Sequence, residues 1–222
     1  MPKAMPIVFI VDDDVSVRES LPPLLECAGW RSETFASAEA FLARPRSCVP
    51  SCLIVDVKLP ALDGLELQHR VAAELPHMPV IFISGHGDVP TTVRAMKAGA
   101  VEFLTKPFDI EVLLNAVREA LERSSDRLGA ASARQALREC YASLSQRERE
   151  VMALVVAGLL NKQVGGELGI SEITVKAHRG RVMRKMKADS VAALVHMAAG
   201  LGLAPAGRRS LVSHSLASHF GD

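Results

Sequence analysis

Four short apolar runs, each followed by a polar side chain, constrain the fold of this chain more than any other feature of its sequence. Asp12 and Asp13 follow the first run, and Asp56, Ser84 and Lys106 follow the other three. Runs rich in β-branched and aromatic residues are typical of buried parallel strands. Because ligands bind outside the carboxyl ends of such strands, these side chains should meet in one crevice. Carboxylates, a hydroxyl and an ammonium at that place can hold a divalent cation and a phosphoryl group.

The apolar runs alternate with helical stretches, as in a parallel sheet that helices cover on both faces. The predicted strands lie near residues 6–12, 31–36, 52–57, 79–85 and 101–106. The predicted helices lie near residues 15–28, 37–43, 64–74, 90–98 and 109–124. We therefore expect an α/β domain with a doubly wound, five-stranded parallel sheet. Pro22 and Pro23 fall inside the first predicted helix, so this helix should either kink there or begin later.

The second half of the chain contains helical patterns and no convincing strand. A capping box at Ser145 opens the first predicted helix, and Gly169 should end a short second helix over residues 161–168. Ser171 should cap a third helix that runs to about residue 186, and Asp189 should open a last one. The short turn between the second and third helices has the spacing of a helix-turn-helix.

These patterns predict four segments. They are a first domain over residues 1–123, a partly helical linker over 124–142, a small all-α domain of four helices over 143–203, and a mostly disordered tail over 204–222.

Charge is divided unequally between the two halves. Residues 1–125 carry 12 Lys and Arg against 17 Asp and Glu, a net charge of −5, whereas residues 126–222 carry 14 against 8, a net charge of +6. The acidic half suits a cation, and the basic half suits a polyanion. The four cysteines form no CxxC pair and no zinc motif, and the first residues resemble neither a signal peptide nor a membrane span. We expect a cytoplasmic protein with reduced thiols and no membrane partner.

A carboxylate can attack a phosphoryl group and form an acyl phosphate. Because the two groups repel each other, a hard cation such as Mg²⁺ has to bridge them. Asp13 and Asp56 can bind Mg²⁺ directly, with Asp12 acting through water. Lys106 can neutralise a phosphate oxygen, and the Ser84 hydroxyl can donate to another.

The first 123 residues, from about residue 5, resemble the receiver domain of two-component response regulators, in particular the FixJ/NarL family. Five motifs in the correct order carry the resemblance. They are Val11 to Asp14, Asp56 to Pro60 with Asp63 and Gly64, Ser84 to Pro90, Ala95 to Ala100, and Lys106 to Phe108.

This resemblance implies that Asp56 receives phosphate from a sensor histidine kinase. The backbone carbonyl of Lys58 would complete the Mg²⁺ shell, and a cis peptide bond between Lys106 and Pro107 would direct the lysine into the site. Ser84 and Phe103 would be the switch residues that rearrange on phosphorylation, and a homodimer would form through the fourth helix, fifth strand and fifth helix. His86 is expected to be a surface loop residue.

The third helix of the basic half has the two faces that a DNA-recognition helix needs. Its predicted core side chains are Ile173, Val175, Val182 and Met186. Its cationic side chains, able to reach phosphates or base edges of double-stranded DNA, are Lys176, Arg179, Arg184 and Lys185.

The segment from about Leu144 to Leu201 resembles the LuxR-type DNA-binding domain. The motifs that carry this resemblance are Leu144 to Glu148, Glu150 and Val151, Gly158, Asn161 and Lys162, Leu168 to Ser171, Thr174 to His178, and Lys185 and Met186. It implies that Asn161 and Lys162 cap the second helix and touch the DNA backbone. The predicted DNA-contacting residues are Thr174, Lys176, His178, Arg179, Arg181, Lys185 and Lys162.

The sequence therefore predicts a phosphorylation-controlled, DNA-binding transcriptional regulator rather than an enzyme with steady turnover. One alternative is a phosphatase of the haloacid-dehalogenase type, with Asp12 as its nucleophile. In that case Asp12→Asn would abolish turnover and Asp56→Asn would not. A second alternative is an adaptor that is never phosphorylated and whose basic half binds protein. Salt-sensitive binding to DNA distinguishes the regulator from the adaptor.

Overall fold

The computed structural model describes residues 5–46, 48–85 and 87–203. The expectations for His86 and for the tail over residues 204–222 lie outside these residues. The chain divides into two compact units, Met1–Ala131 and Ser132–Asp222. We call them the acidic unit and the helical unit.

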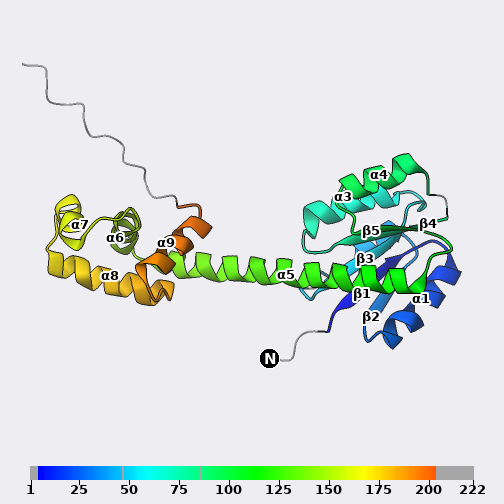
Figure 1. Ribbon diagram of the computed structural model, residues 1–222, viewed down its shortest axis with the longest axis horizontal. Helices are drawn as coiled ribbons and strands as arrows, with labels where there is room; N and C mark the ends of the chain where they lie inside the picture. Colours follow the sequence, from blue (N-terminus) through cyan, green and yellow to red (C-terminus); the bar gives the residue numbers. More distant parts are fainter. Residues whose placement is uncertain (1–4, 47, 86, 204–222) are drawn as a thin grey trace, which may run out of the picture. The chain divides into compact units, whose positions relative to one another are not determined.

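The acidic unit contains a five-stranded sheet in which every strand pair is parallel, as predicted (Figure 1). The strands are β1 Ile7–Val11, β2 Arg31–Phe35, β3 Ser51–Asp56, β4 Val80–Ser84 and β5 Glu102–Thr105. The helices between and after them are α1 Val15–Cys27, α2 Ala38–Leu42, α3 Gly64–Glu74, α4 Val89–Lys97 and α5 Ile110–Ala142. The spatial order β2-β1-β3-β4-β5 reverses direction between β1 and β3, which is where this fold class binds its ligands.

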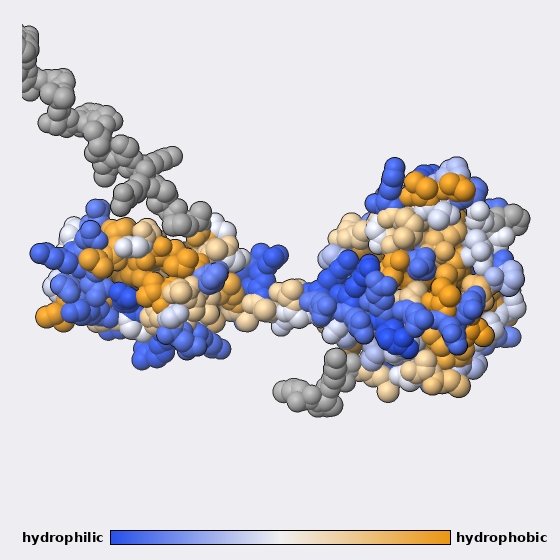
Figure 2. All heavy atoms as spheres, viewed as in Figure 1, coloured by the Kyte–Doolittle hydropathy of each residue, from blue (hydrophilic) through white to orange (hydrophobic). Residues whose placement is uncertain are grey.

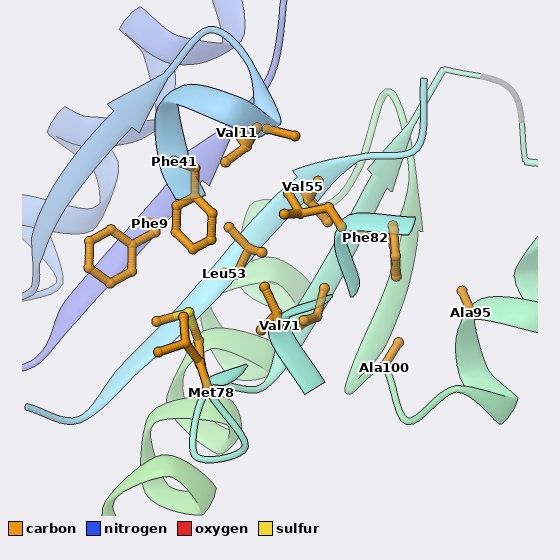
Figure 3. Packing of buried hydrophobic residues seen from close by; sticks show 14 of the residues in the cluster. Phe9, Val11, Phe41, Leu53, Val55, Val71, Met78, Phe82, Ala95 and Ala100 are labelled. Atoms are coloured by element: carbon orange, nitrogen blue, oxygen red, sulfur yellow. The ribbon is translucent and has the colours of Figure 1, made fainter. Parts of the chain in front are cut away.

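Alternate residues of the buried strands pack into two separate cores, one on each face of the sheet. Phe9, Leu53 and Phe82 point to the core that α2, α3 and α4 cover, where Phe9 and Phe41 meet edge to face (Figure 3). The residues next to them in each strand pack instead against α1 and α5. Strands that are buried on both faces read as continuous apolar runs, which explains why the sequence pattern located them.

Helix α1 continues through Pro22 and Pro23. It begins at Val15, where the Asp14 side chain caps it by accepting a hydrogen bond from the backbone N–H of Ser16. The alternative that the helix begins later is therefore wrong. Both prolines lie near the protein surface, so carbonyl groups that lose their helical partners can be hydrated.

Helix α5 is longer than predicted. It was expected to end near residue 124 and to be followed by a partly helical linker, but it runs without a break to Ala142. Its first half packs on the sheet through Leu113, Val117 and neighbouring residues. Near its other end, Leu137 and Tyr141 pack against the core of the helical unit. The expected linker therefore contributes side chains to that core.

Up to residue 203, where the described part of the chain ends, the helical unit contains the last part of α5 and four further helices. These are α6 Gln146–Val156, α7 Asn161–Leu168, α8 Glu172–Met186 and α9 Val191–Gly200. The Ser145 capping box and the Ser171 cap are present, and Gly169 ends α7 in the left-handed conformation (φ 65°). Two predicted caps are wrong. Ser190 rather than Asp189 caps α9, and Asn161 is the first residue of α7 rather than its cap.

The surface of the acidic unit has an apolar area over α4 (Figure 2), where Val89, Val93 and Met96 are exposed. Cys27, Cys48, Cys52 and Cys140 are free thiols. None of the helices within the described residues combines the length and the apolarity that a membrane span requires.

Candidate functional site: an acidic crevice and a helix-turn-helix

Three carboxylates meet at the carboxyl end of the sheet. Asp12 and Asp13 follow β1, and Asp56 is the last residue of the neighbouring strand β3. Each offers an oxygen atom that lies within 4.8 Å of the oxygens offered by the other two. Asp12 and Asp56 are buried, whereas Asp13 is exposed to solvent. Carboxylate oxygens with solvent access on one side are the ligand set that Mg²⁺ prefers, so these residues fit that ion.

Lys106 holds two of these carboxylates together. It follows β5, and its Nζ donates hydrogen bonds to Oδ2 of Asp12 at 2.7 Å and to Oδ2 of Asp56 at 2.8 Å. Its backbone N–H donates to the carbonyl oxygen of Ser84 at 2.7 Å, which fixes it beside the end of β4. The peptide bond between Lys106 and Pro107 is cis, as predicted. Four strand ends therefore contribute to one crevice.

Burial and hydrogen bonding act in opposite directions on the pKa values in this crevice. Burial raises the pKa of Asp12, although hydrogen bonds from Lys106 and from the Asp14 backbone partly compensate. Burial lowers the pKa of Lys106, but its hydrogen bonds to Asp12 and Asp56 outweigh this effect and raise the pKa overall. The lysine therefore stays an ammonium at neutral pH and can pair with a new anion that enters the crevice.

Arg18 and Gly64 support the crevice, and of these only Gly64 was marked by a sequence motif. The Nη1 of Arg18 donates to the carbonyl oxygen of Asp12 at 2.7 Å, which anchors the turn after β1. Gly64 begins α3 directly beneath Asp56, and a Cβ added there would lie 2.3 Å from the Asp56 carbonyl oxygen. Only glycine fits this approach. The motif containing Asp63 and Gly64 marked the position, but the steric reason depends on the tertiary fold.

The predicted switch residues lie on neighbouring strands. Ser84 is buried at the end of β4. Phe103 on β5 is half-buried and stacks on Phe82, with 6.0 Å between the ring centroids. For Lys58, the described contact is its backbone N–H, which donates to Oδ1 of Asp56 at 3.1 Å. The switch function of Ser84 and Phe103 and the role of the Lys58 carbonyl as a metal ligand stay predictions.

A helix-turn-helix forms in the second unit from α7, the turn after it, and α8. A Cβ added at Gly165 would lie 2.7 Å from the carbonyl oxygen of Ile170, so this glycine allows α7 to lie against the turn. A Cβ at Gly166 would meet nothing within 4 Å. A glycine inside a helix ordinarily weakens it, but Gly165 has a packing role as well.

Some of the predicted DNA-contacting residues are free to reach a ligand. Thr174, Lys176 and Arg181 on α8 and Lys162 on α7 are exposed. Lys176 forms an ion pair with Glu172 one turn earlier, at 3.1 Å, and both side chains lie at the surface. Such a pair contributes little to stability and can open when a phosphate approaches.

Others have structural partners within the unit. The Nζ of Lys185 contacts Oε2 of the buried Glu148 at 2.6 Å and the carbonyl oxygen of Ser143 at 3.0 Å. Lys185 therefore has a structural role, because its charge neutralises a buried carboxylate, and its contact with DNA stays a prediction. Arg179 is half-buried and donates to Oδ1 of Asn161 at 3.0 Å, and His178 is half-buried beside it.

The predicted burial of one residue of α8 is wrong. Val175, Val182 and Met186 are buried as expected, but Ile173 is 80% exposed. Residues 175, 182 and 186 recur at helical spacing on one face, and residue 173 is offset from them by about 200° at 100° per residue. Apolar character alone therefore placed Ile173 in the core.

Comparison with known proteins gives a family to both units. Residues 8–118 match the response regulator receiver domain, and residues 142–198 match the bacterial regulatory proteins of the luxR family. Nodulation protein W of Bradyrhizobium diazoefficiens is 50% identical over 197 residues, which cover 89% of this chain and 87% of that protein. The chain belongs to the response regulators. Transcriptional regulatory protein FixJ of Azorhizobium caulinodans is 46% identical over 206 residues, or 93% and 97% of the two chains.

The fold agrees with this family. The solved structure of the response regulator StyR matches with a TM-score of 0.81 and 46% identity, covering 88% of this chain and 99% of that chain. The predicted family and fold class are therefore confirmed. The acidic unit is the receiver, and the helical unit is a LuxR-type DNA-binding domain of a two-component transcriptional regulator. The phosphatase alternative is not favoured.

Proposed function

We propose that this response regulator is phosphorylated on Asp56 by a sensor histidine kinase, and that the phosphorylated form binds double-stranded DNA as a homodimer. The observation that carries the proposal is the meeting of Asp12, Asp13 and Asp56 beside Lys106 at the carboxyl end of the sheet. A merely structural cluster would not need three acidic groups at one opening, because like charges there repel each other.

The phosphoryl transfer follows from the crevice chemistry. A carboxylate oxygen of Asp56 forms the bond to phosphorus, the phosphorus–nitrogen bond to the kinase histidine breaks, and its electron pair stays on the imidazole nitrogen. Asp12, Asp13 and Asp56, with the carbonyl of Lys58, would hold Mg²⁺. When bound, Mg²⁺ neutralises charge that otherwise opposes the transfer. Lys106 would exchange one carboxylate partner for a phosphoryl oxygen, while the Ser84 hydroxyl donates to another.

The conformational change on phosphorylation would involve first Ser84, then Phe103, and then the surface beside these two residues. Phe103 stacks on Phe82 of β4, the strand that ends at Ser84, so a shift of the hydroxyl alters the space available to the ring. The neighbouring helix α4 exposes Val93 and Met96. Apolar side chains grouped on a surface favour association with another protein surface, and we assign them to the homodimer.

Two helical units in a dimer would then read two half-sites of DNA. Lys162, Thr174, Lys176 and Arg181 are the exposed residues that we assign to DNA contact, and His178 and Arg179 lie partly buried beside them. We remove Lys185 from this set because of its pairing with Glu148.

The first test is to incubate the purified protein with Mg²⁺ and acetyl phosphate and to measure its intact mass. The wild type should gain one phosphoryl group, and Asp56→Asn should gain none. Asp63→Asn is a matched control, because this acidic residue caps α3 outside the carboxylate cluster and asparagine also caps helices. Uptake by Asp56→Asn, or none by the wild type, would contradict the assignment of the acceptor. If Asp12→Asn gained no phosphoryl group while Asp56→Asn still gained one, the phosphatase alternative would be favoured instead.

A further inference from the structure

The exposure of Ile173 has no explanation in the folding of the helical unit. The side chain is 80% exposed, whereas Val175 on the same helix is fully buried. A β-branched residue also forms helix less readily than alanine or the long polar residues. Neither burial nor helix propensity therefore accounts for an isoleucine here, whereas a ligand that covers the side chain would account for it.

The position of Ile173 in α8 defines what that ligand can be. It is the second residue of the helix, after the Ser171 cap, which accepts a hydrogen bond from the Thr174 backbone N–H at 3.2 Å. In a helix-turn-helix, the N-terminal residues of the second helix contact base edges in the major groove. Thr174 and Lys176 are exposed in the same first turns. A polar and cationic surface that contains one exposed isoleucine fits a nucleic acid better than an apolar protein surface.

The major groove offers an apolar group at one base. Thymine presents its C5-methyl there, and proteins read it through apolar contacts. We infer that Ile173 determines specificity by packing on a thymine methyl in each half-site, while Lys176 and Arg181 bind phosphates. This inference rests on the DNA binding proposed above and adds a base preference to it. A side chain that only filled space against the DNA backbone would show no such preference.

The inference can be tested with uracil, which differs from thymine by this methyl alone. Phosphorylated wild-type protein is first used to select binding sequences from a random duplex pool. Each thymine of the selected site is then replaced by deoxyuridine, one at a time, and the dissociation constant is measured at fixed salt by fluorescence anisotropy. We expect one thymine per half-site at which removal of the methyl weakens binding about three- to fourfold, the value of one buried methyl group.

The Ile173→Ala variant should lose the penalty at this thymine and keep any penalty at the others. Leu160→Ala is the control, since Leu160 is also an exposed apolar residue (71%) but precedes α7, and this variant should keep the wild-type pattern. Circular dichroism of both variants should show unchanged unfolding, because neither side chain is packed.

Two results would overturn the inference. One is a selected site at which no methyl affects affinity, and the other is an Ile173→Ala variant with the same sensitivity as the wild type. The second result would indicate that the isoleucine faces a protein partner or a second copy instead. If no duplex is selected at all, the proposed DNA binding itself fails, which is a distinguishable outcome.

Discussion

In the receiver unit the charged side chains that we assign to function come from the ends of different strands, whereas in the helical unit they come mainly from one helix. The carboxyl ends of parallel strands lie at one edge of the sheet. The side chains at these ends, those of Asp12, Asp56 and Lys106, therefore meet in one crevice. On α8, Lys176 lies at the surface and Lys185 pairs with a buried glutamate. A helix turns successive residues to all sides, so charge on a helix does not by itself indicate a ligand.

The largest effect on the free energy of unfolding is expected at Gly64, because the receiver site depends on the close approach of the Gly64 and Asp56 backbones. Gly64→Ala places a methyl 2.3 Å from the Asp56 carbonyl oxygen, and the backbone has to move. We expect a loss of about 3 kcal/mol in the free energy of unfolding and impaired phosphorylation, measured by urea denaturation and intact mass. Gly129→Ala, in open space on α5, should instead stabilise the protein by about 0.5–1 kcal/mol. Equal stability of the two variants would contradict this reason for the glycine.

The two lysines of α8 test whether one charged residue of this helix serves stability and the other serves DNA binding. Lys185→Ala leaves the carboxylate of Glu148, which is 3% exposed, without its cation, and should destabilise the unit by about 3 kcal/mol. Lys176→Ala should change stability by less than about 0.5 kcal/mol but weaken DNA binding.

The salt dependence of DNA binding distinguishes the roles of these lysines. The slope of log affinity against log salt should fall by about 1 for Lys176→Ala. It should not change for Lys185→Ala, measured where the variant is folded. A reduced slope for Lys185→Ala would return this residue to the DNA-contacting set.

The pairing of Glu148 also predicts how the helical unit responds to acid. The hydrogen bond from Lys185, together with that from the Ser145 backbone, lowers the pKa of Glu148 to about 2 from an ordinary value of 4.5. A carboxyl whose pKa is lower in the folded state stabilises the protein above its unfolded pKa and loses this contribution as pH falls. Thermal unfolding of wild-type protein should therefore show falling stability between about pH 4.5 and pH 2. Glu148→Gln should be less stable at pH 7 and should lack this part of the pH dependence.

A smaller effect, and one of opposite sign at two neighbouring residues, is expected within α7. Gly166→Ala adds a methyl in open space and should stabilise the helical unit by about 0.5–1 kcal/mol. Gly165→Ala, one residue earlier, should destabilise it because of the Ile170 carbonyl oxygen at 2.7 Å. Chemical denaturation of the two variants side by side checks this. The same sign for both would mean that α7 and the turn separate more easily than the structure indicates.

The sequence predicted the sheet and its crevice well, for a physical reason. Buried strands need continuous apolar runs, so the polar residue that follows each run marks an opening. The caps at Ser145 and Ser171 were also predicted, because a local hydrogen bond defines them. Contacts that no strand or cap pattern marks were not predicted. Examples are the pairing of Lys185 with Glu148, 37 residues away, and the contact of Gly64 with the Asp56 carbonyl.

Apolar patterns in the sequence also failed to predict one buried face and one helix boundary, in α8 and α5. Ile173 was placed in the core from its apolar character, although it lies off the buried face of α8. The segment 124–142 was predicted to be a partly helical linker because it lacks a strong apolar stripe, yet α5 continues through it. Its alanine-rich composition favours helix without any stripe, so helix propensity was the better guide there.

The central claim is that the phosphate on Asp56 controls the affinity of the helical unit for DNA. The direct measurement is the dissociation constant of the full chain for its selected duplex, at fixed salt, with and without prior phosphorylation by acetyl phosphate. We predict at least tenfold tighter binding by the phosphorylated wild type, which corresponds to about 1.4 kcal/mol, and no change for Asp56→Asn after the same treatment. Equal affinity of the phosphorylated and unphosphorylated wild type would contradict the claim, whatever the chemistry at Asp56.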